Sequence, residues 1–284
     1  MKRLLFIIVL AIVGASCQKD SKSYYPDYYR TYNQVRKLQS EGKWQEAIST
    51  FQRAERLVEF VPPDHFIAAR NIAIALNDCD LAKSYYQKAV NQGYEFEQFK
   101  YSGEKCAEIS DQSYEAPEFD TEYRNAILQM IEADQAARTV KGGDARPLHV
   151  IDSLNIHQLL SLIEDKGYPN PKIVGHTAAG DAFILLLHFD SDIGNKILKP
   201  IIDKAYNDGF IAPSQYAWII DRRRNWGPEK LDPHYYQLPT HKYFDLSKEE
   251  IAEIDNRRDS IGLKPLSEMN ISRTENGGIS IQMY

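Results

Sequence analysis

The chain has 284 residues, a formal net charge of −6, and 43% hydrophobic and 26% charged residues. This length is enough for one large domain or two modest ones with a substantial core. The acidic balance disfavours nucleic acid and anionic membrane surfaces as partners, because both bind through clustered lysine and arginine. The three cysteines and seven histidines show no spacing typical of zinc ligands, so we expect no metal and no other cofactor.

Residues 1–16 have the pattern of a signal peptide. Lys2 and Arg3 precede the apolar run Leu4–Val13, which is shorter than the ~20 residues that a membrane-spanning helix needs. Small residues and then Cys17 follow this run. The arrangement resembles the lipobox of bacterial lipoproteins, in which the cysteine carries acyl chains such as palmitate and becomes the mature N-terminus. The resemblance implies a membrane anchor at Cys17; the alternative is plain secretion with an incidental thiol.

Residues 18–22, Gln-Lys-Asp-Ser-Lys, resemble the charged export tags that follow the lipidated cysteine in Bacteroidetes surface lipoproteins. This resemblance implies attachment to the outer membrane, facing either the periplasm or the cell surface. Residues 17–30 are polar and rich in tyrosine, and we expect them to form a lipidated tether; the alternative is that part of this segment folds into a helix.

Residues 31–115 are predicted to form helical repeats. Two triplets of an alanine, an aromatic residue and an alanine recur with an offset of 35 positions: Ala47, Phe51, Ala54 and Ala82, Tyr86, Ala89. Together with Gly42 and Trp44, these triplets resemble two tetratricopeptide repeats, which implies stacked antiparallel helix pairs. The alternative is two ordinary helical hairpins whose spacing coincides. Residues 94–117 are expected to connect this region to the next, with a short helix at 104–109.

Cys79 and Cys106 are the only cysteines after Cys17. An exported protein meets an oxidising environment, in which two remaining cysteines pair readily. The sequence leaves two alternatives open, a disulfide between them or two inert buried thiols.

Residues 116–266 are predicted to form a second helical domain. Apolar periodicity and helix-stop residues indicate five helices before a loop at 228–244, and Ser247 with Glu250 marks the start of a sixth. The first five expected ranges are 119–140, 155–166, 177–189, 195–207 and 214–224, the third of them apolar almost all round. Residues 267–284 are expected to form a polar tail with a stray strand near its end. No series of alternating strands is present, so the predicted fold class is all-α.

Polar residues are interleaved with the apolar positions of this second region. They resemble, in order and spacing, a bacterial domain of unknown function that occurs in lipoproteins after helical repeats. The matching residues are Asp134, Gln135, Arg138, Asp152, Asn155, Gly167, Tyr168, Pro169, Gly175, His188, Asp190, Tyr216, Ala217, Asp221, Arg222, Arg257, Arg258, Ile261, Gly262 and Leu263. The resemblance covers about half of the chain and implies a helical fold, but no reaction.

One interpretation of these polar residues is catalytic. His188 would act as general acid or base, with Asp221 orienting its imidazole and Tyr216 donating to a developing oxyanion. Arg138 or Arg222 would hold an anionic group of the substrate. The other candidate ligand-binding residues are Asp134, Asp152 and Asn155. In the alternative interpretation the same groups satisfy one another and join helices together.

Two hypotheses for the function follow. The first is a binding or scaffold module of the cell envelope, with a protein or peptide partner on the helical repeats. The second is a hydrolase centred on His188. A scaffold predicts exposed aromatic side chains on the repeats, whereas an enzyme predicts that His188, Asp221 and an arginine converge in one pocket.

Overall fold

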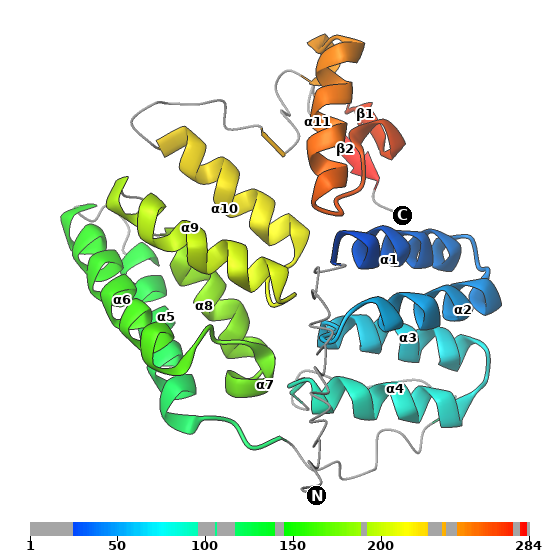
Figure 1. Cartoon of the computed structure of the whole chain (residues 1–284), viewed down its shortest axis with the longest axis horizontal. Helices are drawn as coiled ribbons and strands as arrows, with labels where there is room; N and C mark the ends of the chain where they lie inside the picture. The colour runs from blue at the N-terminus through cyan, green and yellow to red at the C-terminus, as the bar shows by residue number, and fades with distance from the viewer. Residues whose placement is uncertain are drawn as a thin grey trace, which may run out of the picture.

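The computed structural model describes residues 25–95, 106, 117–139, 145–188, 192–226, 235–236, 243–274 and 279–282. In these parts the chain forms eleven α-helices and one two-stranded sheet, which confirms the predicted all-α class (Figure 1). Helices α1–α4 lie together in one half, and helices α5–α10 form the other half. No helix among the described residues has the length and hydrophobicity that crossing a membrane requires.

The first half consists of two helical hairpins. Helix α1 pairs with α2 and α3 pairs with α4. The bounds are α1 Tyr25–Ser40, α2 Trp44–Ala54, α3 Pro63–Ala75 and α4 Cys79–Asn91, with a short 3₁₀ turn η1 at Glu55–Leu57.

The offset of 35 residues extends to the turns of the two hairpins. Gly42 and Asn77 both have left-handed backbone, with φ of 70° and 62°. In each turn the next residue donates its N–H to a carbonyl five positions back, from Lys43 to Leu38 and from Asp78 to Ala73, both at 2.9 Å. This bond satisfies an otherwise unpaired carbonyl at the helix end, and glycine and asparagine tolerate the left-handed conformation best.

The two triplets lie in the core of this half, with every alanine fully buried. Alanine at these positions allows the helices to approach closely, and the aromatic side chain fills the remaining space. The ring of Phe51 contacts Tyr32, Phe66 and Tyr85 edge-on, with centroids 5.4 to 6.2 Å apart. Such contacts stabilise an aromatic pair by about 0.5–1.5 kcal/mol beyond the burial of area.

The C-terminal end of the segment 17–30 is not a tether but helical, which is the alternative that the sequence left open, because α1 begins at Tyr25. Tyr25, Tyr28, Tyr29 and Tyr32 are spaced so that they share one face of α1, and all four are buried. His65 of α3 stacks on Tyr32 at 3.6 Å between centroids, and its Nδ1 lies 2.7 Å from the Tyr28 hydroxyl. Burial lowers the pKa of His65 to about 4, so this histidine is neutral near pH 7.

The second half is built around α8. This apolar helix packs on α5, α6, α7 and α10, as expected for the buried helix of the domain. The bounds are α5 Thr121–Thr139, α6 Ala145–Lys166, α7 Pro171–Val174, α8 His176–His188, α9 Asp192–Asn207 and α10 Pro213–Trp226. Helix α6 begins ten residues before its expected start at Asn155, because Pro147 falls in its first turn, where a proline is tolerated.

The two halves pack closely against each other. Phe210 contacts buried residues of both halves and lies 5.2 Å from the ring of Phe60. A Cβ atom on Gly93 would lie 2.0 Å from the carbonyl oxygen of Pro171, so only glycine fits this approach. Glu95 accepts a hydrogen bond at 2.8 Å from the backbone N–H of Thr177, which lies in the first turn of α8. A carboxylate at this end complements the dipole of the helix.

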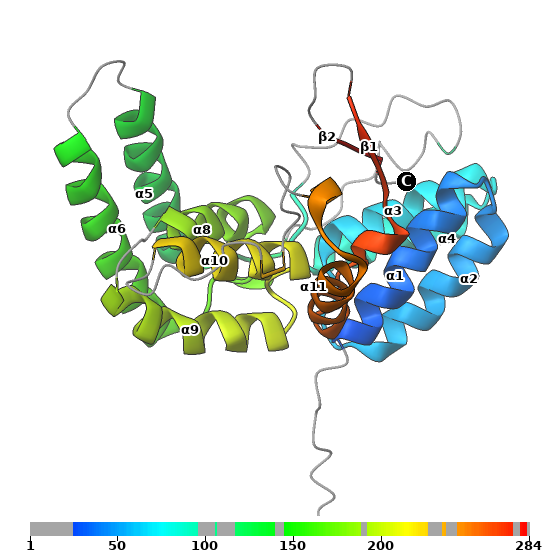
Figure 2. The ribbon, with the colours of Figure 1, turned by 90° about the horizontal axis from the view of Figure 1, so that it is seen from above.

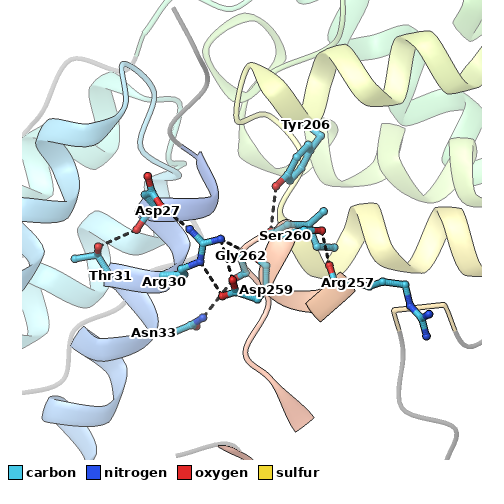
Figure 3. Close-up of polar contacts among 10 residues, drawn as sticks. Asp27, Arg30, Thr31, Asn33, Tyr206, Arg257, Asp259, Ser260 and Gly262 are labelled. Carbon is cyan, nitrogen blue, oxygen red and sulfur yellow. Dashed lines mark hydrogen bonds and ion pairs between the residues drawn. The ribbon is translucent and has the colours of Figure 1, made fainter. Parts of the chain in front are cut away.

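The C-terminal part of the chain returns to α1 (Figure 3). Helix α11 spans Lys248–Ser260 and begins with the expected capping box of Ser247 and Glu250. Arg30 of α1 donates to the carboxylate and to the carbonyl of Asp259 at 2.8 Å each. Tyr206 of α9 donates to the carbonyl of Ile261 at 3.0 Å, so α1, α9 and α11 meet at the end of α11.

Strands β1 (Asn270–Arg273) and β2 (Ile279–Gln282) form an antiparallel pair at the C-terminal end, with Ile271 opposite Ile281. The single stray strand expected in the polar tail therefore has a partner within the same tail. The short 3₁₀ turns η4 and η5 lie at Tyr243–Asp245 and Leu266–Glu268.

Candidate functional site

Four of the predicted site residues meet where α5, α6 and α8 pack together. Asp134 and Arg138 lie one turn apart on α5, Asp152 lies on α6, and His188 is the last residue of α8. Hydrogen bonds join all four side chains. We call Asp134, Arg138, Asp152 and His188 the polar cluster.

Asp134 is the centre of the polar cluster and is fully buried. Its carboxylate accepts two hydrogen bonds from Arg138, at 2.9 and 3.1 Å, and one from Gln135 at 2.7 Å. The Nδ1 atom of His188 lies 3.0 Å from the same carboxylate. Burial alone raises the pKa of Asp134, but hydrogen bonds from Arg138 and His188 outweigh it, so the net pKa is lowered. The carboxylate is therefore ionised near neutral pH.

Arg138 links the two acidic residues of the polar cluster. The same Nη2 atom that bonds to Asp134 also donates to Asp152 at 2.7 Å. Burial raises the pKa of Asp152, and the nearby charge of Asp134 adds to this rise, while Arg138 opposes both. Arg138 thus holds two carboxylates from two helices, which leaves less of its guanidinium for an anionic ligand.

Asn155 follows Asp152 by one turn on α6 and is also buried. Its amide donates to the carbonyl oxygen of Met130 on α5 at 3.0 Å. This bond satisfies a backbone group and ties α6 to α5, which is the structural role that buried amides usually have.

The expected pairing of His188 with Asp221 is wrong, because Asp134 accepts the hydrogen bond of the imidazole. Asp221 on α10 is buried, and both of its carboxylate oxygens accept the backbone N–H of Tyr236 at 3.1 Å. The carbonyl of Tyr236 in turn accepts from Arg258 of α11 at 2.6 Å. Asp221 and Arg258 thus hold the short segment at 235–236 from both sides.

Tyr216 and Arg222 lie on α10 and are half-buried. Tyr216 donates its hydroxyl to Asp203 of α9 at 2.9 Å, and burial followed by this hydrogen bond raises its pKa. The hydroxyl is thus committed to a carboxylate rather than to an oxyanion of a substrate. The hydrogen bonds that hold the polar cluster together come from its own four side chains, and Arg222 donates none of them.

The structure joins Cys79 and Cys106 by a disulfide, with Cα atoms 5.3 Å apart. Cys79 is the first residue of α4, so the bond fixes Cys106 to the start of this helix. Cys17 lies outside the described residues, as does the helix expected at 104–109 except for Cys106. Within the described parts, no three acidic, histidine or cysteine side chains are grouped in a way that holds a metal ion.

Comparison with known proteins gives no relative: no family model, no curated protein and no solved structure matches this chain. The assignment of a function therefore depends on the residues and their geometry.

Sequence reasoning did not identify two features of the chain beyond α4. The first is the role of Asp134 as partner of His188; the available signal was its spacing of four positions from Arg138. The second is a set of exposed apolar side chains. Among the described residues the exposed large hydrophobic ones are Val150, Leu154, Ile197, Trp218 and Phe244. None of them lies on α1–α4, where a scaffold with a binding groove on the repeats was expected to carry exposed aromatic residues.

Proposed function

We propose that the protein is a binding module of the bacterial cell envelope, held to the outer membrane by a lipid on Cys17. In this proposal the paired hairpins α1–α4 are tetratricopeptide-like and support the second half. The observation that carries the proposal is that the side chains of the polar cluster form hydrogen bonds with one another across three helices. A group that already joins helices is occupied by that role, so the polar residues favour structure over chemistry.

In this proposal a protein partner contacts the exposed side chain of Trp218. Trp218 on α10 is 51% exposed, although its ring lies against that of Phe183. Tryptophan is among the residues that contribute most to protein interfaces, because it buries a large area with little loss of conformational freedom. We therefore place the partner on the second half rather than in a groove of the repeats.

A photo-reactive amino acid at position 218 tests this proposal in living cells. Illumination is expected to join the protein covalently to one defined partner, whereas the same amino acid at position 83, an exposed lysine of α4, gives no such product. The product is also expected to persist in a His188→Ala background, since the proposal assigns no chemistry to that residue. Identical products from positions 218 and 83, or none from either, would contradict the proposal.

A second candidate function is a hydrolase that uses His188 as general acid or base. The observation that favours it is the contact of His188 Nδ1 with a buried, ionised aspartate. When Nδ1 carries the proton, this contact fixes the tautomer in which Nε2 is the acceptor, the arrangement of a catalytic histidine.

A panel of ester, amide, phosphate and glycoside substrates separates the two candidates. Hydrolysis that disappears in His188→Ala and persists in His157→Ala, a change at an exposed histidine of α6, would support the enzyme. Failure to hydrolyse any substrate, or equal activity in both variants, supports the binding module.

A further inference from the structure

A histidine of α3 supports the N-terminal helix of the described chain. Tyr25, Tyr28, Tyr29 and Tyr32 form one buried face of α1, which we call the tyrosine face. The ring of His65 stacks on Tyr32 with centroids 3.6 Å apart. It also lies 5.7 Å from the rings of Tyr28 and Tyr29, and its Nδ1 atom lies 2.7 Å from the Tyr28 hydroxyl. Through His65, α3 thus contacts three of the four tyrosines.

The surroundings of His65 favour its neutral form. The hydrogen bond that the structure gives to the imidazole involves a neutral hydroxyl rather than a carboxylate. His65 is also the third residue of α3, where the helix dipole disfavours an added positive charge. The charged groups near the ring are Arg36 of α1 and Asp64 of α3. Burial is the largest cause that lowers the pKa of His65 to about 4, and Arg36 adds to it, while the exposed Asp64 opposes both.

The contact between α1 and α3 includes one cost that is present at any pH. The hydroxyl of Tyr29 is buried and has no hydrogen-bond partner among the described residues. Such a hydroxyl regains its hydration when it meets water, so it favours release of the helix that carries it. His65 is half-buried, so a proton reaches its ring while α1 is still in place. A charge on this ring adds a second cost to the same contact.

The end of α11 depends on α1 as well (Figure 3). A Cβ atom on Gly262 would lie only 2.9 Å from the Cβ atom of Tyr29, so the backbone here packs directly on the tyrosine face. Arg30 of α1 donates to the carboxylate of Asp259, and Asn33 of α1 donates to the carbonyl of Gly262 at 3.3 Å. A displacement of α1 therefore removes these contacts of α11 at the same time.

We propose that protonation of His65 is a switch that releases α1 from α3, and with it the end of α11, while α5 and α8 stay folded. The Tyr28 hydroxyl accepts a hydrogen bond as readily as it donates one, so the change arises from the unhydrated charge on the stacked ring and not from a lost bond. The switch does not depend on the proposed function, because it involves neither Cys17 nor Trp218.

The direction of the pH dependence follows from the lowered pKa. Once α1 is released, His65 regains an ordinary pKa near 6.5, whereas the pKa is about 4 when α1 is in place. The packed arrangement is therefore fully favoured above the ordinary value. It loses this advantage as the pH falls toward about 4, by about 100-fold in the equilibrium between the two arrangements.

Hydrogen–deuterium exchange of the purified full chain in a nonionic detergent tests the switch. Mass spectrometry compares the protection of each helix at neutral pH and at about pH 4, after correction for the intrinsic exchange rate. The amides of α1 are expected to lose about 100-fold in protection. The amides of α5 and α8 are expected to keep theirs, because these helices make no contact with His65 in the described structure.

Two variants and one matched control identify His65 as the cause. The double variant Tyr28→Phe/His65→Phe keeps the ring contacts without a titrating group, so the loss of protection in α1 is expected to disappear. His157→Phe, a change at an exposed histidine of α6, is the control and is expected to retain the full loss. Tyr28→Phe alone is also expected to retain it, which keeps the test informative if the double variant folds poorly.

Proton NMR of the histidine rings measures the titration of His65 directly, with an expected midpoint at about 4. A midpoint at the ordinary value of 6.5 would overturn the proposal. A wild-type chain in which α1 is equally protected at both pH values would also overturn it, as would a loss of protection in α1 and α5 together. Loss of protection in the double variant to the same extent as in the wild type would exclude His65 as the switch.

Discussion

Replacement of Asp134 by asparagine removes the charge at the centre of the polar cluster with almost no change in shape. The aspartate is fully buried and accepts hydrogen bonds from Arg138, Gln135 and His188. An amide at this position places two N–H donors against a set of donors, so at least one of these contacts is lost. Removal of one partner of a buried ion pair costs about 3–5 kcal/mol, and since Arg138 is partly exposed we expect about 2–4 kcal/mol.

Urea unfolding followed by circular dichroism measures this loss as a lower midpoint at an unchanged slope. The matched control is Asp208→Asn, which removes an exposed carboxylate that pairs with Lys204 one turn away on the surface. Exposed pairs of this kind contribute about 0.3–0.5 kcal/mol, so the control is expected to lie close to the wild type. A loss below about 1 kcal/mol for Asp134→Asn, or equal losses for both variants, would refute the structural role of the polar cluster.

The same variant has a predicted pH dependence. The pKa of Asp134 is lower in the folded chain than its usual value, so its stabilising contribution is complete above the unfolded pKa of about 4. The contribution disappears as the pH falls through the folded pKa. The wild-type chain is therefore expected to lose more stability than Asp134→Asn between neutral and strongly acidic pH. A difference in unfolding free energy that stays constant over this range would contradict the assignment.

Two further changes probe how the first half is held in place. Reduction of the Cys79–Cys106 disulfide is expected to cost about 3–4 kcal/mol, because the bond closes a loop across 27 positions of sequence; unfolding with and without reductant measures it, and an unchanged midpoint would count against it. Gly93→Ala is expected to cost about 3 kcal/mol or more, because its left-handed backbone and the carbonyl of Pro171 both exclude a Cβ atom. Gly42→Ala, which has left-handed backbone but open space, is the control at about 1 kcal/mol, and equal losses would show that the close approach contributes nothing.

The sequence predicts most of the fold because each helix is determined largely by residues that lie close together in the chain. The nearly uniform apolar composition of 177–189 identifies α8 as a buried helix, and the pair Ser247 and Glu250 marks the start of α11 by satisfying its first N–H groups. The offset of 35 residues predicts two equivalent hairpins, and it extends to the left-handed turn residues Gly42 and Asn77. These signals depend only on residues close together in the chain.

The errors arise where distant parts of the chain decide the outcome. Tyr25, Tyr28 and Tyr29 form a helical face only because α3 and the end of α11 cover it. The sequence alone does not reveal this cover, so a polar segment rich in tyrosine is predicted to be a tether.

The partner of His188 was ambiguous in the same way. Asp134 lies 54 positions before His188 and Asp221 lies 33 positions after it, and the packing of α5 on α8 selects Asp134. The local sequence pattern carries no information on which aspartate pairs with His188, because this pairing depends on which helices are neighbours in the fold.

The central claim is that the polar cluster joins helices rather than performing chemistry, and the unfolding free energy of His188→Ala tests it most directly. A structural role predicts a loss of about 1–2 kcal/mol, because the change leaves the carboxylate of Asp134 with one hydrogen bond fewer. A residue kept for catalysis at the expense of stability gives the opposite result, since its removal leaves the stability unchanged or increases it. An unfolding free energy of His188→Ala equal to or above that of the wild type would therefore contradict the account.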